Sequence, residues 1–130
     1  MPGIKHDNGK PRLDLVDPKW LTAVATVLGF GAEKYSDHNW REGLNWSRLY
    51  AALQRHLTAF HSGEINDPES GFPHLAHASC NLMMLYVLQE KPELNDLYWA
   101  AINQSKSGWE ELCKGFSEVK KNLEDGYDDN

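Results

Sequence analysis

Apolar residues recur at the three- and four-residue spacing of an amphipathic α-helix in several stretches of the chain. The first stretch follows Asp17 and Pro18, an N-cap acceptor and the residue best suited to the first helical position. It is predicted to form a helix to about Tyr35, with loosening expected at Gly29 and Gly31. No stretch sustains the period-two alternation of a β-strand, so an all-α protein is predicted.

Two further helices are predicted downstream, from near Ser47 to Gly63 and from His74 to about Gln89. Gly63 suits the left-handed conformation that commonly ends a helix. The later helix is apolar on nearly every side, which is typical of the central helix of a bundle. Because a few short neighbours would not cover such a helix, we expect the chain to form a homodimer or homotetramer.

The remaining segments are shorter. An acidic loop with two prolines and two glycines, GEINDPESGFP, joins the second and third helices. Pro92 begins a short apolar segment, and a last amphipathic helix is predicted from Trp109 to Leu123, followed by an acidic end that is expected to fray. Together these elements predict a four- or five-helix bundle.

Composition narrows the classes of function. The 130 residues are enough for one domain that buries roughly two thirds of its unfolded surface. A net charge of -6 argues against coating a nucleic acid. The two cysteines lack the spacing of a zinc or disulfide framework, and no apolar stretch reaches signal-peptide length or the ~20 residues that span a bilayer. We therefore expect a cytoplasmic protein that binds neither nucleic acid nor a membrane.

Two histidines and an asparagine form a polar stripe on the otherwise apolar third helix. His74 and His77 are three residues apart and Asn81 follows four later, which places them on one face. His56, on the core-facing side of the second helix, is expected to meet this stripe. Burying such groups without partners costs about 1–3 kcal/mol each, so a metal, a carboxylate network or a ligand is expected to satisfy them. Structural hydrogen bonds across the bundle are the alternative.

Cations and aromatic side chains that suit a nucleotide gather along the first half of the chain. A guanidinium group can bind two phosphate oxygens at once, and an aromatic ring can stack on a base. The candidate substrate-binding residues are Lys10, Arg12, Lys34, Tyr35, Asn39, Trp40, Arg48, Arg55 and Asn81, with Trp46 as a further ring. The alternative is that these rings seal the end of a small bundle and the arginines lie on its surface. The glycine motifs of P-loop and dinucleotide-binding proteins are absent from the sequence.

These residues belong to an ordered set of motifs: NGKPRLDL, FGAEKY, NWREG, WSRLYAALQRHL, GE followed by DPESG, and HLAHASCN. Over roughly residues 8–88, the set resembles the phage and bacterial dATP/dGTP diphosphohydrolase family, whose relatives belong with the MazG-type all-α nucleoside triphosphate pyrophosphohydrolases. The resemblance implies a family-like helical domain over residues 1–90 and a helical C-terminal extension of it over residues 91–130. It also implies a location in the host cytoplasm if the chain is phage-encoded.

The reaction implied by this resemblance is the hydrolysis of a purine deoxynucleoside triphosphate, dGTP or dATP, to the monophosphate and pyrophosphate with a divalent metal. In the MazG-type relatives, pairs of acidic residues hold the metal, whereas this chain has His74 and His77 in the place of one pair and His56 in the place of another acidic residue. The implied ligands are therefore His56, His74, His77 and Glu64. Mg²⁺, Mn²⁺ or Co²⁺ is expected, and imidazole ligands favour an ion softer than Mg²⁺.

The expected mechanism assigns Asp67 and Glu69 as catalytic carboxylates, with Glu69 taking a proton from a metal-bound water. The site is expected where the second and third helices meet, with the DPESG loop as one wall and the N-terminal segment as a flap. Three alternatives stay open. They are a nucleotide-binding protein that sequesters its ligand without turnover, a metal-dependent phosphohydrolase that releases triphosphate or orthophosphate, and a structural helix-pairing protein.

Overall fold

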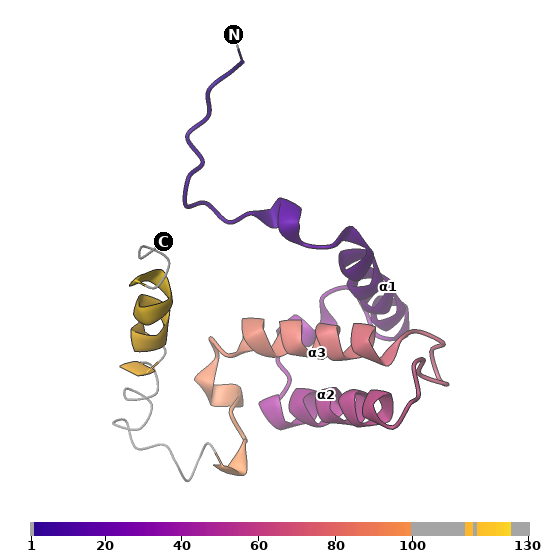
Figure 1. The fold of residues 1–130 in the computed structure, drawn as a ribbon. Coiled ribbons are helices and arrows are strands. Elements are labelled where there is room, and N and C mark those ends of the chain that lie inside the picture. Colours follow the sequence, from indigo (N-terminus) through magenta and orange to yellow (C-terminus); the bar gives the residue numbers. More distant parts are fainter. Residues whose placement is uncertain (1, 100–113, 116, 126–130) are drawn as a thin grey trace.

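The computed structural model describes residues 2–99, 114–115 and 117–125, and its long elements are all helices (Figure 1). They are listed here with the shorter 3₁₀ turns: η1 (Leu13–Leu15), α1 (Pro18–Lys34), η2 (Asn39–Glu42), α2 (Trp46–His61), α3 (His74–Leu88) and η3 (Pro92–Leu94). Within the described residues, β pairing is limited to one isolated bridge between Asn66 and Pro73. The all-α prediction is therefore confirmed.

Helix α1 begins as its sequence predicts. The side chain of Asp17 accepts a hydrogen bond from the backbone N–H of Lys19 at 2.7 Å, and Pro18 occupies the first turn. The expected loosening at Gly29 and Gly31 is wrong, because α1 runs through both without interruption. Tertiary packing explains the difference, since buried apolar residues of α1 pack against α3 and hold the helix together.

Helix α2 ends in the glycine turn that its sequence predicts. The backbone of Gly63 has a φ of +99°, a left-handed conformation that strains any residue with a Cβ. The N–H of Glu64 donates to the carbonyl of Ala59, and the N–H of Gly63 donates to the carbonyl of Phe60. This pair of bonds is the Schellman arrangement, which satisfies carbonyls that the helix end would leave unpaired.

The start of α2 is capped by a residue far along the chain. The carboxylate of Asp96 accepts from the backbone N–H of Ser47 at 2.9 Å and from its hydroxyl at 2.5 Å. These hydrogen bonds lower the pKa of Asp96. A carboxylate at a helix N-terminus also interacts favourably with the helix dipole. The segment after Pro92 is therefore tied to the helices before it.

Helix α3 packs against both α1 and α2, which confirms its predicted central position. One buried cluster joins α1 to α3 and consists of Val24, Val27, Ala76 and Cys80. A second joins η2, α2 and the end of α3 and consists of Trp40, Leu49 and Leu88, with Leu94 of η3 packed against it. Figure 1 shows α2 and α3 side by side, joined by the loop of residues 62–73.

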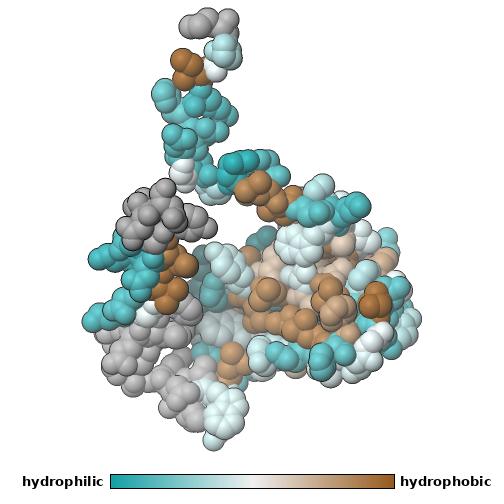
Figure 2. Space-filling view, in the orientation of Figure 1, coloured by the Kyte–Doolittle hydropathy of each residue, from teal (hydrophilic) through white to brown (hydrophobic). Residues whose placement is uncertain are grey.

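One side of α3 is left uncovered. Leu75, Leu82 and Tyr86 are exposed large apolar side chains of this helix. Their spacing of seven and four residues places them on one helical face. Figure 2 shows apolar side chains gathered over the part of the molecule where α3 lies in Figure 1.

The predicted helix at residues 109–123 falls partly on residues outside those described. Residues 114–115 and 117–125 are helical, so this helix extends two residues past Leu123. Residues 109–113 and 116, and the rest of the acidic end at 126–130, lie outside the described residues. Among the described helices, none has both the length and the apolar character needed to cross a membrane.

Candidate functional site

The loop between α2 and α3 folds back onto the start of α3. The N–H of Asp67 donates to the carbonyl of Phe72 at 2.8 Å, and the N–H of His74 donates to the carbonyl of Ile65 at 2.9 Å. Gly71, at φ +77°, allows the sharp reversal between the two halves of the loop. The carboxylates of the loop are thereby carried to the first turn of α3.

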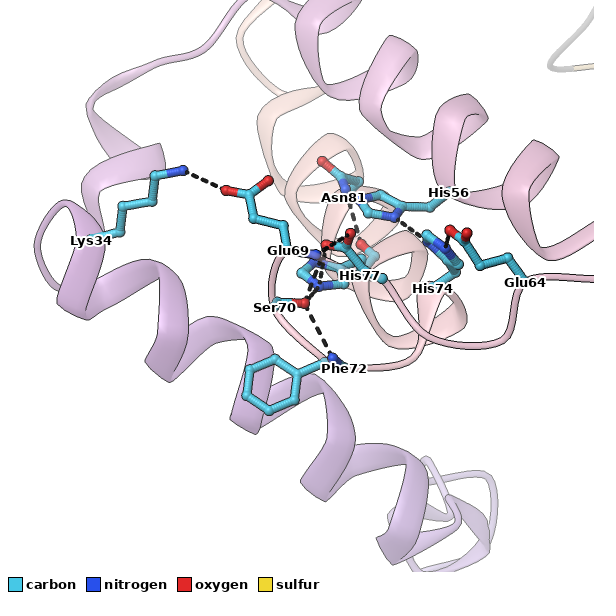
Figure 3. Close-up of polar contacts among 10 residues, drawn as sticks. Lys34, His56, Glu64, Glu69, Ser70, Phe72, His74, His77 and Asn81 are labelled. Carbon is cyan, nitrogen blue, oxygen red and sulfur yellow. Dashed lines mark hydrogen bonds and ion pairs between the residues drawn. The ribbon is translucent and has the colours of Figure 1, made fainter.

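Three histidines meet where α2 faces α3, as their sequence positions predict (Figure 3). The Nδ1 atoms of His56 and His74 lie 2.8 Å apart, within hydrogen-bond distance. The ring of His56 stacks on that of His77, with centroids 4.5 Å apart and planes 5° from parallel. His74 is only 4% exposed, so its partners must come from the protein.

Glu64 is that partner for the outer nitrogen of His74. Its Oε1 lies 2.6 Å from the Nε2 of His74. An ionised carboxylate only accepts hydrogen bonds, so the Nε2 of His74 carries a proton. In a neutral His74, the other ring nitrogen, Nδ1, then accepts from the Nδ1–H of His56.

Ser70 is the hydrogen-bond partner of the Nε2 of His77. Its Oγ lies 2.7 Å from the Nε2 of His77 and donates to the Oδ2 of Asp67 at 3.2 Å. Because the hydroxyl has one proton and gives it to the carboxylate, the Nε2 of His77 must be the donor to Ser70. Two carboxylates, Glu64 directly and Asp67 through Ser70, thus set the same ring tautomer in His74 and His77.

The sequence reasoning missed Ser70. Its signal is local, since Asp67 accepts from the backbone N–H of Glu69 two residues on and from the hydroxyl of Ser70 three residues on. An Asp followed three residues later by Ser is typical of such an Asx turn. What the local pattern does not show is that the same hydroxyl reaches His77 across the loop.

The environment lowers the pKa values of His56, His77 and Asp67. Burial, followed by the neighbouring His77 and His74, lowers the pKa of His56, and burial also lowers that of His77. Both rings are therefore favoured in the neutral form near neutral pH. For Asp67, burial acts to raise the pKa, but the hydrogen bonds from Glu69 and Ser70 and the nearby His77 outweigh it, and the net pKa is lowered.

A pocket of about 900 Å³ adjoins this cluster and extends between α1, η2 and the α2–α3 pair. It is lined by eleven of the residues that the sequence singled out: Lys34, Tyr35, Asn39, Trp40, Arg55, His56, Asp67, Glu69, His74, His77 and Asn81. Its apolar wall includes Leu28, Phe30, Met83 and Met84. Cys80 lines it too, but burial raises the pKa of its thiol to about 11, which argues against a thiolate nucleophile.

Charged side chains mark the open side of the pocket. Lys34 Nζ lies 3.5 Å from the Oε1 of Glu69, whose side chain is 73% exposed (Figure 3). Arg55 is exposed and has no hydrogen bond or ion pair within the described part of the chain. The pocket therefore offers cations to an anionic ligand at little cost in broken contacts.

The other three predicted binding residues are not brought to the pocket. Lys10 and Arg12 lie on an N-terminal segment that runs away from the helices (Figure 1), and Arg12 pairs with Asp14, with 2.6 Å between Nη2 and Oδ2. The expected flap is therefore not formed. Arg48 is exposed on α2 but does not line the pocket. The sequence identifies these cations, but only the tertiary structure decides which of them line the pocket.

Trp40 and Trp46 serve mainly as core residues, which was the alternative left open for them. Trp40 is buried with Leu49 and Leu88, and Arg41 lies over its ring at 4.3 Å. The indole N–H of Trp46 donates to the carbonyl of Leu88 at 3.0 Å. Trp40 also borders the pocket, so one ring both seals the bundle and faces a ligand.

The implied divalent metal can be compared with the donors that are present. Among the described residues, no group of three or more His, Cys, Asp or Glu side chains is arranged to hold a metal ion. Glu64 lies behind His74, bound to its Nε2, and does not line the pocket. The residues His56, His74, His77 and Glu64 thus do not form a ready-made set of ligands, and the described arrangement does not fit a resident metal.

Together these features define an all-α protein whose pocket combines a histidine–carboxylate cluster with exposed cations and an apolar wall. Residues 1–97 match the family described as "dATP/dGTP diphosphohydrolase, N-terminal", and the chain belongs to this family. It is 40% identical over 102 residues to a protein of Salmonella phage PMBT28 named dATP/dGTP diphosphohydrolase, an alignment that covers 78% of this chain and 35% of that relative. The chain thus spans about a third of the length of the relative it matches. No solved structure matches it.

Proposed function

We propose that the chain hydrolyses a purine deoxynucleoside triphosphate, dGTP or dATP, to the monophosphate and pyrophosphate. The name of the phage relative and the family support this reaction class. The observation that carries the proposal is that one pocket of about 900 Å³ holds both a polar cluster and an apolar wall. Its volume lies within the ~300–1,000 Å³ typical of small-molecule sites. A nucleotide has the same two parts, a charged triphosphate and a flat base.

The charged side chains of the lining suit the triphosphate. Arg55 has no hydrogen bond or ion pair in the described structure, whereas Lys34 has a long contact to Glu69 and lies 5.5 Å from the centroid of the Tyr35 ring. A phosphate oxygen that binds Lys34 would release the carboxylate of Glu69 into the pocket. A divalent cation, Mg²⁺, Mn²⁺ or Co²⁺, enters this proposal as the companion of the substrate phosphates.

The apolar side chains of the lining suit the base. Phe30, Trp40 and Met83 are among them, and rings and thioethers make favourable contacts with flat aromatic groups. The side-chain N–H of Asn81 donates to the carbonyl of His77 at 2.9 Å, which leaves its oxygen to accept from an amino group of the base. Asn39 is the second amide on the lining. These contacts favour a purine over an apolar ligand.

The two loop carboxylates have different parts in this proposal. Asp67, through Ser70, holds the ring of His77 in one tautomer. Glu69 lines the pocket and pairs with Lys34, so a substrate phosphate that binds Lys34 would free its carboxylate. Both were predicted as catalytic, and the arrangement supports a positioning role for Asp67 and a substrate-coupled role for Glu69.

The test is product analysis on the purified chain. Each deoxynucleoside and ribonucleoside triphosphate is incubated with Mg²⁺, Mn²⁺ or Co²⁺, and the products are separated by anion-exchange chromatography. Monophosphate and pyrophosphate from a purine deoxynucleotide are expected. Arg55→Ala is expected to raise KM at least tenfold, whereas Arg48→Ala, outside the pocket on the same helix, should change KM less than threefold. Release of triphosphate or orthophosphate would refute the proposed reaction.

A second candidate is a protein that binds the nucleotide without turnover. The observation in its favour is that the described residues contain no group of three or more side chains able to hold a metal. Calorimetry distinguishes the two. Binding of dGTP or dATP with no product under any of the three cations would replace hydrolysis by sequestration.

We also propose that a second copy of the chain covers the exposed face of α3, giving a homodimer or homotetramer. Leu75, Leu82 and Tyr86 on this face support it, because contiguous exposed apolar surface commonly marks an interface. Sedimentation equilibrium is expected to give at least twice the 14.8 kDa of one chain, and Leu82→Lys is expected to shift the mass to that of the monomer.

The free, buried thiol of Cys80 and a nucleotide substrate agree with a cytoplasmic location.

A further inference from the structure

We propose that His56 is the general base of the hydrolysis, and that Glu64 and His74 are positioning residues that hold it ready. This inference rests on the proposed function and names the group that activates water. It follows from a continuous line of contacts, from the Oε1 of Glu64 to the Nε2 of His74, and from the Nδ1 of His74 to the Nδ1 of His56 (Figure 3).

The line of contacts determines where the protons are. Glu64 accepts from the Nε2–H of His74, so the Nδ1 of His74 is free to accept. The Nδ1 of His56, 2.8 Å away, then carries the proton between the two rings. In the neutral ring of His56, this leaves a lone pair on Nε2, the atom of a base rather than of a donor.

The Nε2 of His56 has no partner among the described residues. No hydrogen bond to this atom exists within the described residues, whereas its Nδ1 is engaged with His74. The same residues contain no buried side-chain nitrogen or oxygen without a partner, so this unpaired nitrogen is accessible to solvent. His56 also lines the pocket that the substrate would fill.

Burial and the neighbouring His77 and His74 lower the pKa of His56, which keeps the resting ring neutral, and Glu64 is the group placed to stabilise the charge that the ring gains during the reaction. The carboxylate of Glu64 stands one ring away, joined through the 4% exposed ring of His74, where a low local dielectric strengthens the interaction. The ring of His77 stacks on that of His56, with 4.5 Å between the ring centroids, and holds its orientation. Glu69, the base expected from sequence, lacks such support, because its exposed carboxylate pairs with Lys34.

The step balances without a further reactant. The Nε2 of His56 takes a proton from water as the water oxygen forms a bond to one phosphorus of the α–β linkage. The bond from that phosphorus to the bridging oxygen breaks, and the bridging oxygen keeps the electron pair. His56 becomes an imidazolium, whose charge Glu64 stabilises through His74 without itself accepting the proton. The imidazolium then returns its proton to the solvent or to a leaving phosphate oxygen.

The experiment is chemical rescue of a histidine deletion in the purified, active chain. His56→Ala is expected to lower kcat by about 10²–10⁴-fold, the usual contribution of a general base, with KM changed less than threefold. Added imidazole should restore part of kcat by entering the space left by the ring. Substituted imidazoles should restore it more as their basicity rises. His61→Ala, an exposed histidine at the end of the same helix, is the matched control and should retain full kcat.

The positioning role is tested by Glu64→Gln, which keeps an acceptor but removes the charge. It is expected to lower kcat by about 10–100-fold with KM unchanged, and imidazole should not rescue it, because the ring of His56 still fills its place. Glu64→Asp should recover part of the loss.

Three results would overturn the inference. One is full kcat in His56→Ala. Another is rescue of His56→Ala by raised divalent cation but not by imidazole, which would make His56 a metal ligand. The third is imidazole rescue of His77→Ala but not of His56→Ala, which would move the base to His77. Absence of product from the unmodified chain would instead refute the proposed function, so the two failures are distinguishable.

Discussion

Replacing Leu88 by alanine removes the most deeply buried side chain of the described fold. Leu88 is 2% exposed and packs with Trp40 and Leu49 in the cluster that joins η2, α2 and the end of α3. It lies at the opposite end of α3 from His74. The substitution therefore tests the packing of the bundle and leaves the first turn of α3, with its polar cluster, intact.

The expected cost follows from the size of the group removed. The leucine side chain loses three carbon atoms, and at about 0.8 kcal/mol per buried carbon group the transfer term is about 2.4 kcal/mol. The cavity left among the rigid rings adds to this, so a loss of about 3 kcal/mol in the free energy of unfolding is expected, inside the observed ~2.7–5 kcal/mol range for buried Leu→Ala. For a chain of this size, that lowers Tm by roughly 10 °C.

The assay is urea unfolding followed by helical circular dichroism, with both variants at the same protein concentration. Leu21→Ala on α1 is the matched control, because this leucine is 58% exposed and should cost no more than about 0.5 kcal/mol. A loss below about 1 kcal/mol for Leu88→Ala, or an equal loss for both variants, would refute the described core.

Two further predictions concern stability. Gly63→Ala should cost about 1–2 kcal/mol because its φ of +99° strains a residue with a Cβ. Gly29→Ala inside α1, where nothing lies within 4 Å of the added carbon, should stabilise by about 0.5–1 kcal/mol. Thermal unfolding measures both, and the absence of a loss for Gly63→Ala would contradict the described turn. The free energy of unfolding should also fall as pH drops below 6.5. Because the pKa values of His56 and His77 are lowered in the folded protein, the unfolded chain binds more protons at these two rings than the folded chain does. The groups that face the two rings are His74, Asp67, Glu69 and Arg55. Urea midpoints at pH 7.5 and 5.5 test this, and the double variant His56→Gln/His77→Gln should flatten the difference; an unchanged slope in that variant would place the effect elsewhere.

Much of the local structure was predictable from short-range signals. The Asp17–Pro18 start of α1, the Gly63 end of α2 and the span of α3 each depend on the backbone preferences of a few neighbouring residues. The meeting of His56 with His74 and His77 was predictable for the same reason. Helical periodicity places them on facing sides of adjacent helices joined by a short loop.

The errors share a different cause. Glycine propensity suggested a loosened α1, but packing of Val24 and Val27 outweighs a cost of about 1 kcal/mol per glycine. Cations of similar local sequence divided between the pocket and the open surface, with Arg55 on the lining and Arg48 and Arg12 away from it. These outcomes depend on how helices cross, and no short-range pattern records that crossing.

By itself, then, the sequence determined the all-α class, the helix ends and the group of histidines, because these depend on periodicity and on local backbone preference. Only the tertiary structure decided the hydrogen bonds within that group. It placed Glu64 behind His74, set Ser70 between His77 and Asp67, and left one nitrogen of His56 open. Those contacts depend on a loop that folds back across ten residues, and hydrogen bonds are sensitive to differences of a few tenths of an ångström that a linear pattern cannot encode.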